Sequence, residues 1–355
     1  SLIQHEVLCS SVDSATGGRC GSHPGTEGGV FVYPRHFIVV LKPDSTQDQL
    51  HSSVEPAGGI LGGSKPKLSY TLESFKGYHV SASDDLIKSI ANLGEVAYVE
   101  PDATISINAL EMQTDAPWGL APGADTYAYI IDTGIYLEHE DFEGRATFGA
   151  SFVDGDASET DGNGHGTHVA GTTGSKTYYV HDLLKHAPEW TRAEGIGKAV
   201  ANMSLGASRL VSQSVNNAAA AAVRAGLFLS VAAGNDGSLA SLSSPASEPS
   251  VCTMAATDAT GRRASFSSFG TAVDVFAPGV DILSTWNDGA TNTISGTSMA
   301  APHVTGLGAY LLALEGARDP IALCERIQEL ATSGIVKNSL TPNNLLAFNG
   351  ADSSA

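Results

Sequence analysis

Charged side chains are scarce in this chain, and positive ones are the scarcest. Of the 355 residues only 16% are charged, and 19 Lys and Arg stand against 38 Asp and Glu, which gives a net charge of −19 at pH 7. Binding to nucleic acid draws on Lys and Arg to neutralise phosphates. The balance therefore argues against nucleic acid and against an anionic membrane surface as partners, and we interpret the acidic surface as a source of solubility.

Long apolar runs and metal-type cysteine pairs are also absent. No stretch reaches the roughly 18 uninterrupted apolar residues of a membrane span, and no charged start followed by an apolar run is visible as a signal peptide. The four cysteines, Cys9, Cys20, Cys252 and Cys324, form no Cys-x-x-Cys pair, which argues against structural zinc. An even number of cysteines is compatible with disulfides. Cys9 and Cys20 either close a small loop or stay free thiols.

A small unit and a larger one follow each other along the chain. Residues 1–34 are rich in Gly and lack apolar periodicity, so we expect an irregular tail. Residues 35–110 show the order β-α-β-β-α-β, which predicts a small α+β ferredoxin-like domain. Its expected elements are strands at 37–41, 68–72, 75–80 and 96–99, a short helix near 45–54 and a helix capped by Ser83.

Residues 111–355 instead alternate buried-type strands with helices. This alternation predicts an α/β domain of three layers, with helices on both faces of a parallel sheet. The strands are expected at 127–131, 199–205, 227–233, 251–256 and 273–277, and the helices at 215–224 and 298–314.

Three motifs in the larger unit carry side chains suited to catalysis. Asp132 ends the first strand, where open α/β sheets place their ligands. His165 stands in the glycine-rich run 161–171, and histidine is the usual general base near neutral pH. Ser298 falls at the start of the long helix, where backbone N–H groups favour negative charge.

Each motif also has a plainer interpretation when taken alone. Asp132 could be a turn former, and Ser298 could be only a helix N-cap. His165 and His168 could bind metal, but the zinc-protease pattern His-Glu-x-x-His is absent, so we expect His168 to be a packed helix residue. Pro302 is expected in or near the first helical turn, where proline is tolerated.

Taken together, the three motifs predict nucleophilic catalysis. A serine hydroxyl becomes a good nucleophile when a base removes its proton, and the base needs a carboxylate to hold its tautomer. The order Asp132, His165, Ser298 is the order of these residues in subtilisin. Asp-Thr-Gly, His-Gly-Thr-His-Val-Ala-Gly and Gly-Thr-Ser-Met-Ala-Ala-Pro-His resemble the three signatures of the subtilisin superfamily of serine proteases.

Further segments extend this resemblance to the proteinase K-like fungal branch. Residues 231–235 resemble the segment with the oxyanion asparagine, which would be Asn235, and residues 204–206 resemble the strand that pairs with substrate. Residues 247–252 and 283–286 narrow the match to the branch. The substrate-binding residues that the resemblance implies are Ser204, Leu205, Gly206, Ala233, Gly234 and Thr297.

The resemblance also implies a precursor that is secreted or vacuolar. Residues 35–110 would be an inhibitory propeptide, cut off between Leu110 and Glu111, from a monomeric protease of broad specificity that acts on polypeptides. The branch's calcium site would be formed by the carbonyls of Pro249 and Val251 with Asp274. Cys252 and Cys324 match a bonded pair of the family.

The chain departs from the family between His165 and Ser204, which lie only 39 positions apart. The family places another strand, a substrate loop and a helix in this interval, so the sequence predicts that they are lacking between 178 and 199. The chain is then either a normal enzyme recorded from a flawed gene model or splice form, or a catalytically impaired relative. The intact triad and Asn235 favour the first.

Three other functions are alternatives to the protease, and one of them takes residues 35–107 as the functional part, an inhibitor of other subtilases. A non-catalytic binding protein could keep the same scaffold. An esterase or lipase would carry Gly-x-Ser-x-Gly at a strand-to-helix elbow, whereas Ser298 stands in Gly-Thr-Ser-Met-Ala.

Overall fold

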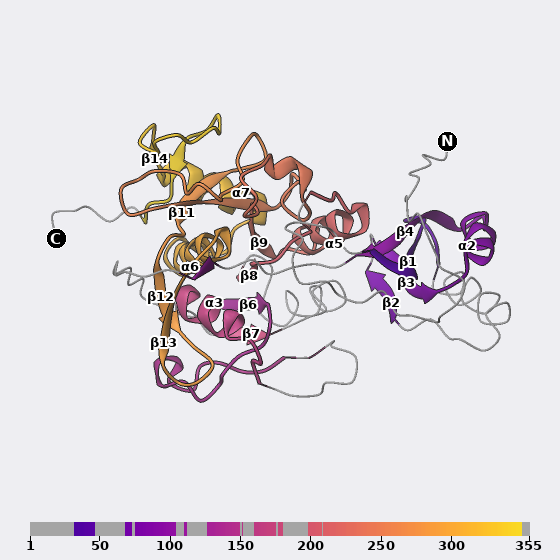
Figure 1. The fold of residues 1–355 in the computed structure, drawn as a ribbon, viewed down its shortest axis with the longest axis horizontal. Coiled ribbons are helices and arrows are strands. Elements are labelled where there is room, and N and C mark those ends of the chain that lie inside the picture. Colours follow the sequence, from indigo (N-terminus) through magenta and orange to yellow (C-terminus); the bar gives the residue numbers. More distant parts are fainter. Residues whose placement is uncertain are drawn as a thin grey trace, which may run out of the picture.

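The computed structural model contains a small domain and a larger one, which lie side by side (Figure 1). The expected tail lies outside the described residues up to position 31, together with Cys9 and Cys20. No helix in the described part of the chain is both long and apolar enough to cross a membrane. The structure describes residues 32–46, 68–72, 75–103, 110–111, 126–149, 151, 160–174, 177–179, 198–207 and 209–349.

The small domain has the predicted ferredoxin-like order. Its four strands pair in the order β2-β3-β1-β4, and every neighbouring pair is antiparallel. The expected helix near 45–54 falls mostly outside the described residues. The elements are β1 (Val32–Leu41), β2 (Leu68–Leu72), β3 (Phe75–Ser81), α2 (Asp84–Ala91) and β4 (Val96–Ala103).

Helix α2 covers one face of this sheet. Ser83 is its N-cap, as predicted, and the Ser83 hydroxyl accepts a hydrogen bond from the N–H of Leu86. Leu86 and Ile90 pack against Val39 and Tyr78 of the sheet, and all four side chains are buried. Leu86 and Ile90 are four residues apart, so they lie on the same face of α2, and this apolar face packs against the sheet.

The opposite face of the small sheet packs on helix α5 (Gln213–Arg224) of the larger domain. Val40 and Phe75 meet Ala218 and Ala221, whose small side chains let sheet and helix approach closely. Glu100 accepts hydrogen bonds from the backbone N–H (2.9 Å) and hydroxyl (2.7 Å) of Ser214 in the first turn of α5. A carboxylate is favourable there, since the N-terminal end of a helix carries positive partial charge.

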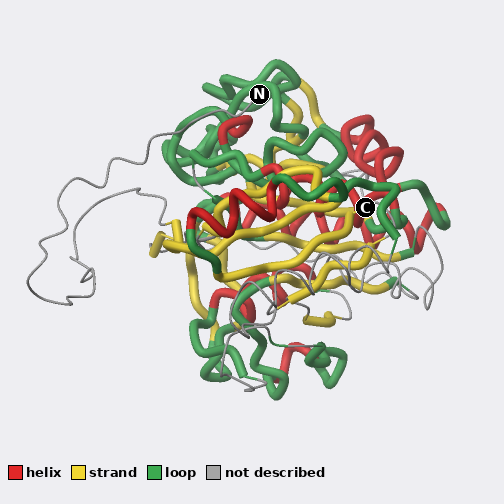
Figure 2. The backbone as a smooth tube through the Cα atoms, turned by 90° about the vertical axis from the view of Figure 1, so that its right-hand side faces the viewer, coloured by secondary structure: helices red, strands yellow, loops and turns green. Residues whose placement is uncertain are grey.

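The large domain is built on a sheet of eight strands with helices across it (Figure 2). Strands β6 to β11 are all parallel, as predicted, and an antiparallel pair closes one edge. The order is β14 (Thr332–Ser333), β15 (Leu345–Leu346), β11 (Val275–Pro278), β10 (Cys252–Thr257), β9 (Phe228–Ala232), β8 (Ala199–Met203), β6 (Tyr127–Ile131) and β7 (Thr177–Tyr179). The helices are α3 (His165–Thr173), α5, α6 (Thr297–Glu315) and α7 (Pro320–Leu330), with 3-10 turns at Glu140–Phe142 and Ala240–Leu242.

Strand β7 is a feature that the sequence analysis did not anticipate. It pairs in parallel with β6, on the side away from β8, so β6 has a neighbour on both sides although the chain between His165 and Ser204 is short. Residues 180–197, where the remaining predicted loss of a substrate loop and a helix falls, lie outside the described residues.

A separate β-hairpin contacts helices α3 and α6. Strands β12 (Ile282–Thr285) and β13 (Thr291–Ser295) pair in antiparallel fashion, and β5 (Leu110–Glu111) adds to β13 with Leu110 opposite Ser295. The sequence analysis predicted none of these three strands. The predicted processing site therefore lies along the strand that leads directly into α6.

Candidate active site

Asp132 and His165 form a buried pair at the carboxyl edge of the sheet. Asp132 follows β6 and His165 is the first residue of α3, and His165 Nδ1 lies 2.6 Å from Asp132 Oδ1. The same oxygen accepts the backbone N–H of Thr133 at 2.8 Å. The Nε2 atom of His165 is buried and has no hydrogen-bond partner among the described residues. A carboxylate on Nδ1 keeps the proton there and leaves Nε2 as a base.

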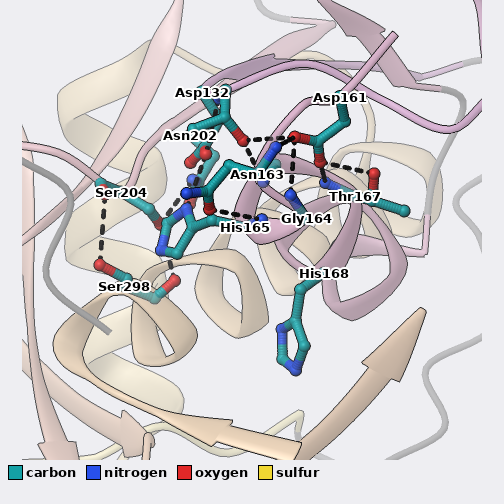
Figure 3. Close-up of polar contacts among 12 residues, drawn as sticks. Asp132, Asp161, Asn163, Gly164, His165, Thr167, His168, Asn202, Ser204 and Ser298 are labelled. Atoms are coloured by element: carbon teal, nitrogen blue, oxygen red, sulfur yellow. Dashed lines mark hydrogen bonds and ion pairs between the residues drawn. The ribbon is translucent and has the colours of Figure 1, made fainter. Parts of the chain in front are cut away.

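Ser298 lies on the Nε2 side of this ring (Figure 3). It is the second residue of α6, whose N-cap is Gly296, so Ser298 is not itself the N-cap. Its hydroxyl donates to the carbonyl of Ser204 at 3.2 Å, while the Ser204 hydroxyl donates to the Ser298 carbonyl at 2.6 Å. The end of β8 and the start of α6 are thereby tied together at the candidate nucleophile.

Pro302 explains why the Ser298 carbonyl can accept this bond. The proline stands inside α6, in the second turn and thus near the first turn, as expected. A proline has no N–H, so the carbonyl four residues earlier, that of Ser298, receives no bond from the helix. The hydroxyl of Ser204 fills that place.

Asp161 organises the loop that leads into α3. Its carboxylate accepts from the backbone N–H groups of Asn163, Gly164 and Thr167 and from the hydroxyls of Thr133 and Thr167. Burial would raise the pKa of Asp161, but these hydrogen bonds outweigh burial and hold it below its usual value. The carboxylate thus fixes the backbone on both sides of His165.

Two glycines let the loop approach Asp132 closely. Gly134 has φ +133°, and a Cβ there would lie 2.7 Å from the Cα of Asp161. A Cβ on Gly166 would lie 2.3 Å from the carbonyl oxygen of Gly134. Neither position can hold a larger residue without displacing the chain that carries Asp132 or His165.

His168 is a packed helix residue, as expected. It is fully buried, its Nε2 lies 2.8 Å from the carbonyl oxygen of Ile282, and its ring meets the edge of Trp286. Burial lowers the pKa of His168 to about 3, against the opposing effect of the Ile282 carbonyl.

The burial of neutral His168 predicts a pH-dependent stability. In the unfolded chain this histidine gains a proton below pH 6.5, whereas in the folded chain it stays neutral down to about pH 3. As the pH is lowered from 6.5 to about 3, the unfolding free energy is therefore expected to decrease, by up to about 1.4 kcal/mol per pH unit for one proton. Urea denaturation of Ser298→Ala should show this slope, and His168→Gln in that background should flatten it. An unchanged slope would assign the proton uptake elsewhere.

Asn235 follows β9 and is held by the first residue of α6. Its side-chain oxygen accepts the backbone N–H and the hydroxyl of Thr297, both at 2.8 Å. The Thr297 hydroxyl also accepts the N–H of Gly234 at 3.2 Å. Because the amide oxygen is occupied in this way, the amide nitrogen faces the opposite direction and can donate to an oxyanion.

A pocket opens beside Ser298 and Asn235. Its wall contains seven of the predicted site residues, and none of the described side chains that line it is charged. The lining residues are Ser204, Leu205, Gly206, Ala207, Ala232, Gly234, Asn235, Ser243, Ser244, Thr297 and Ser298. The arrangement can receive a neutral side chain next to a serine, a base and an oxyanion donor.

Comparisons with known proteins agree with this geometry. The subtilase family profile matches residues 183–333, and the peptidase inhibitor I9 profile matches residues 36–108. A cuticle-degrading protease of Metarhizium anisopliae is 43% identical over 320 residues, which cover 78% of this chain and 81% of the relative. The chain belongs to the subtilase family.

Other relatives and a solved structure support the assignment. Alkaline protease 1 of Aspergillus clavatus is 41% identical over 338 residues, covering 82% of this chain and 83% of the relative. The crystal structure of a cold adapted subtilisin-like serine proteinase matches with a TM-score of 0.60 and 35% identity, covering 69% of this chain and 97% of that one. This subtilase is a subtilisin-like serine endopeptidase with an I9 inhibitor domain, and nothing in these comparisons favours an impaired relative.

Some predicted residues of this subtilase lie away from the pocket. Ala233 is fully buried in a cluster with Ala240 and Phe276, and Ala232 lines the pocket instead. The reason is that neighbouring residues of a strand point to opposite faces, and the consecutive apolar residues 231–233 conceal which of them faces the pocket. Leu110 and Glu111 of the predicted processing site form strand β5. Cys252 and Cys324 form the predicted disulfide.

Several residues that shape the subtilase site were missed from sequence. Asn202 is fully buried in β8, donates to the Ser204 hydroxyl at 2.8 Å and accepts from the Thr305 hydroxyl at 3.2 Å. An asparagine inside an apolar strand was the signal, because a buried amide needs polar partners. Ser243 and Ser244 come from a distant loop, and no pattern in the sequence marks them.

Proposed function

We propose that this subtilase is a secreted or vacuolar endopeptidase of broad specificity that uses Asp132, His165 and Ser298 as its catalytic triad. The observation that carries the proposal is the 2.6 Å contact of His165 Nδ1 with Asp132 Oδ1, with the opposite nitrogen of the ring toward Ser298. Nε2 of His165 takes the hydroxyl proton as Ser298 Oγ attacks the scissile carbonyl carbon, and later gives that proton to the leaving amine.

Asn235 and the start of α6 stabilise the negative charge that develops during the reaction. The tetrahedral intermediate carries an oxyanion, which the side-chain amide of Asn235 and the backbone N–H of Ser298 stabilise as donors. Thr297 holds the Asn235 amide in that orientation before substrate arrives. Such preorganised donors lower the barrier because they need not reorient during the reaction.

The pocket supports broad rather than charge-selective specificity. The described lining combines small side chains, glycine and the apolar Leu205, and no charged residue is among them. Residues 204–206 form one wall, and their backbone can pair with an extended substrate, as an added strand does. Apolar contacts of this kind discriminate weakly among side chains of similar size.

Self-processing tests the triad directly. Intact-mass measurement over time should show the wild-type chain splitting near Leu110–Glu111, while Ser298→Ala stays whole. Ser284→Ala, which removes a hydroxyl that donates to the His168 carbonyl, is the matched control and should split like wild type. A Ser298→Ala chain that splits at the wild-type rate would exclude Ser298 as the nucleophile of processing.

The location outside the cytosol rests on the disulfide of Cys252 and Cys324. Such bonds form and persist in oxidising compartments. Fractionation of cells that make the protein from its own gene should find the protease in the medium or in the vacuole. Recovery in the cytosolic fraction alone would contradict the proposal.

We further propose a structural calcium ion held by Asp274 and the carbonyls of Pro249 and Val251. The Asp274 carboxylate has two neutral partners, the N–H of Thr253 at 2.8 Å and the Gln328 amide at 3.4 Å. Burial raises the pKa of Asp274 to about 6, despite the Thr253 donation. A half-buried carboxylate that has no cationic partner among the described residues suits a hard cation, because such cations prefer oxygen ligands.

Removal of calcium tests this site. In the Ser298→Ala background, a chelator should lower the melting temperature by roughly 5–10 °C relative to calcium held near one hundred times its Kd. Asp274→Asn should abolish the difference, and Asp288→Asn, at an exposed carboxylate, should keep it. A melting temperature that is indifferent to chelation in the control would exclude the ion.

A further inference from the structure

Three metal-type ligands meet on the inhibitor domain, far from the catalytic residues in sequence. His36 comes from β1, His79 from β3 and Asp102 from β4, which are adjacent strands (Figure 1). One ligand atom of each lies within 4.8 Å of the other two. We propose that these three side chains bind a divalent metal ion of the zinc class.

The spacing of the ligand atoms fits tetrahedral coordination. His36 Nδ1 lies 3.3 Å from His79 Nε2, and His79 Nε2 lies 3.4 Å from Asp102 Oδ2. Bonds of about 2.0–2.1 Å to a tetrahedral zinc ion require ligand atoms about 3.3–3.4 Å apart. Both separations have this value without an ion, so these two pairs of ligand atoms need little rearrangement, and the third pair lies within 4.8 Å.

The chemistry of the three ligands selects the class of metal. Two imidazoles and a carboxylate suit zinc and neighbouring transition metals, whereas calcium and magnesium prefer oxygen ligands alone. The side chains of His79 and Asp102 are 14% and 32% exposed, which is enough for an ion to enter from solvent. A fourth coordination position is left for water.

The site lies on the face of the small sheet that packs on α5. Along β4, Asp102 follows Glu100 by two residues, and along β3, His79 follows Phe75 by four, so strand alternation places them on one face. Glu100 and Phe75 are among the residues that contact α5. A metal ion here joins three strands of a small domain, and it stabilises the fold that makes this contact.

Zinc titration of the uncut chain tests the proposal. The protein is the Ser298→Ala precursor with Cys9 and Cys20 changed to serine, so that neither self-cleavage nor these thiols interfere. Calorimetry should give one zinc ion per chain, and cobalt should give the visible absorption of a tetrahedral site. His79→Gln and Asp102→Asn should each weaken binding by more than about 100-fold, because the loss of a mere outer-shell partner already costs about 10- to 100-fold.

Ser81→Ala is the matched control, since it changes a neighbour of His36 on the same sheet and keeps all three ligands. It should bind zinc within about twofold of the parent, and zinc should raise the melting temperature of both but not of His79→Gln. No zinc binding, or binding that His79→Gln leaves unchanged, would overturn the site. Both results are independent of protease activity.

Discussion

Asp132→Asn is expected to lower kcat by about 10⁴-fold on an apolar chromogenic peptide. This is the size of effect that loss of the carboxylate has in subtilisin and in chymotrypsin. An amide at position 132 can donate to His165 Nδ1, which places the ring proton on Nε2 and removes the base that Ser298 needs. The 2.6 Å contact would survive, so the fold should not change.

Two measurements accompany the Asp132→Asn assay. Circular dichroism and the urea midpoint should match those of the parent, because the pair keeps its geometry. Asp141→Asn, at an exposed carboxylate that also approaches a histidine ring, should retain full activity. If Asp132→Asn keeps more than a tenth of parent activity, another group orients His165.

Asn235→Ala is expected to lower kcat by about 10²–10³-fold with little change in KM. Removal of the asparagine donor has this effect in subtilisin itself, because the donor acts on the oxyanion and not on the ground-state carbonyl. Asn292→Ala, on β13, is the control and should behave like the parent. A raised KM at constant kcat would instead make Asn235 a substrate-binding residue.

Thr297 offers a second test of the same idea. Its N–H and hydroxyl both hold the Asn235 oxygen, so Thr297→Val removes one of the two bonds and leaves the donor itself in place. We expect a smaller fall in kcat than for Asn235→Ala, and Thr297→Ser, which keeps the hydroxyl, should recover most of it.

The sequence was sufficient to predict the elements that have a clear apolar repeat or a recognisable motif. The apolar repeat of the long helix predicted 298–314, and the structure has Thr297–Glu315. Asp132 and His165 meet because parallel strands and their following helices bring distant residues to one edge of the sheet. The small domain followed from four short apolar runs and the Ser83 cap.

The parts that could not be predicted depend on contacts between distant segments. The reciprocal bonds of Ser204 and Ser298 require β8 and α6 to be in place. The hairpin β12–β13 is short and partly polar, so its pattern resembles a loop. At the end of β9, the three consecutive apolar residues Val231, Ala232 and Ala233 hid which of the two alanines faces the pocket.

The contact between Glu100 and the first turn of α5 has a consequence for how this protein can evolve. The inhibitor domain holds the enzyme through Ser214, Asn217 and the alanine face of α5, and none of these residues lines the pocket. Substitutions there can lengthen or shorten the life of the precursor while the chemistry stays unchanged. Natural selection can therefore adjust when proteolysis begins separately from how fast it runs.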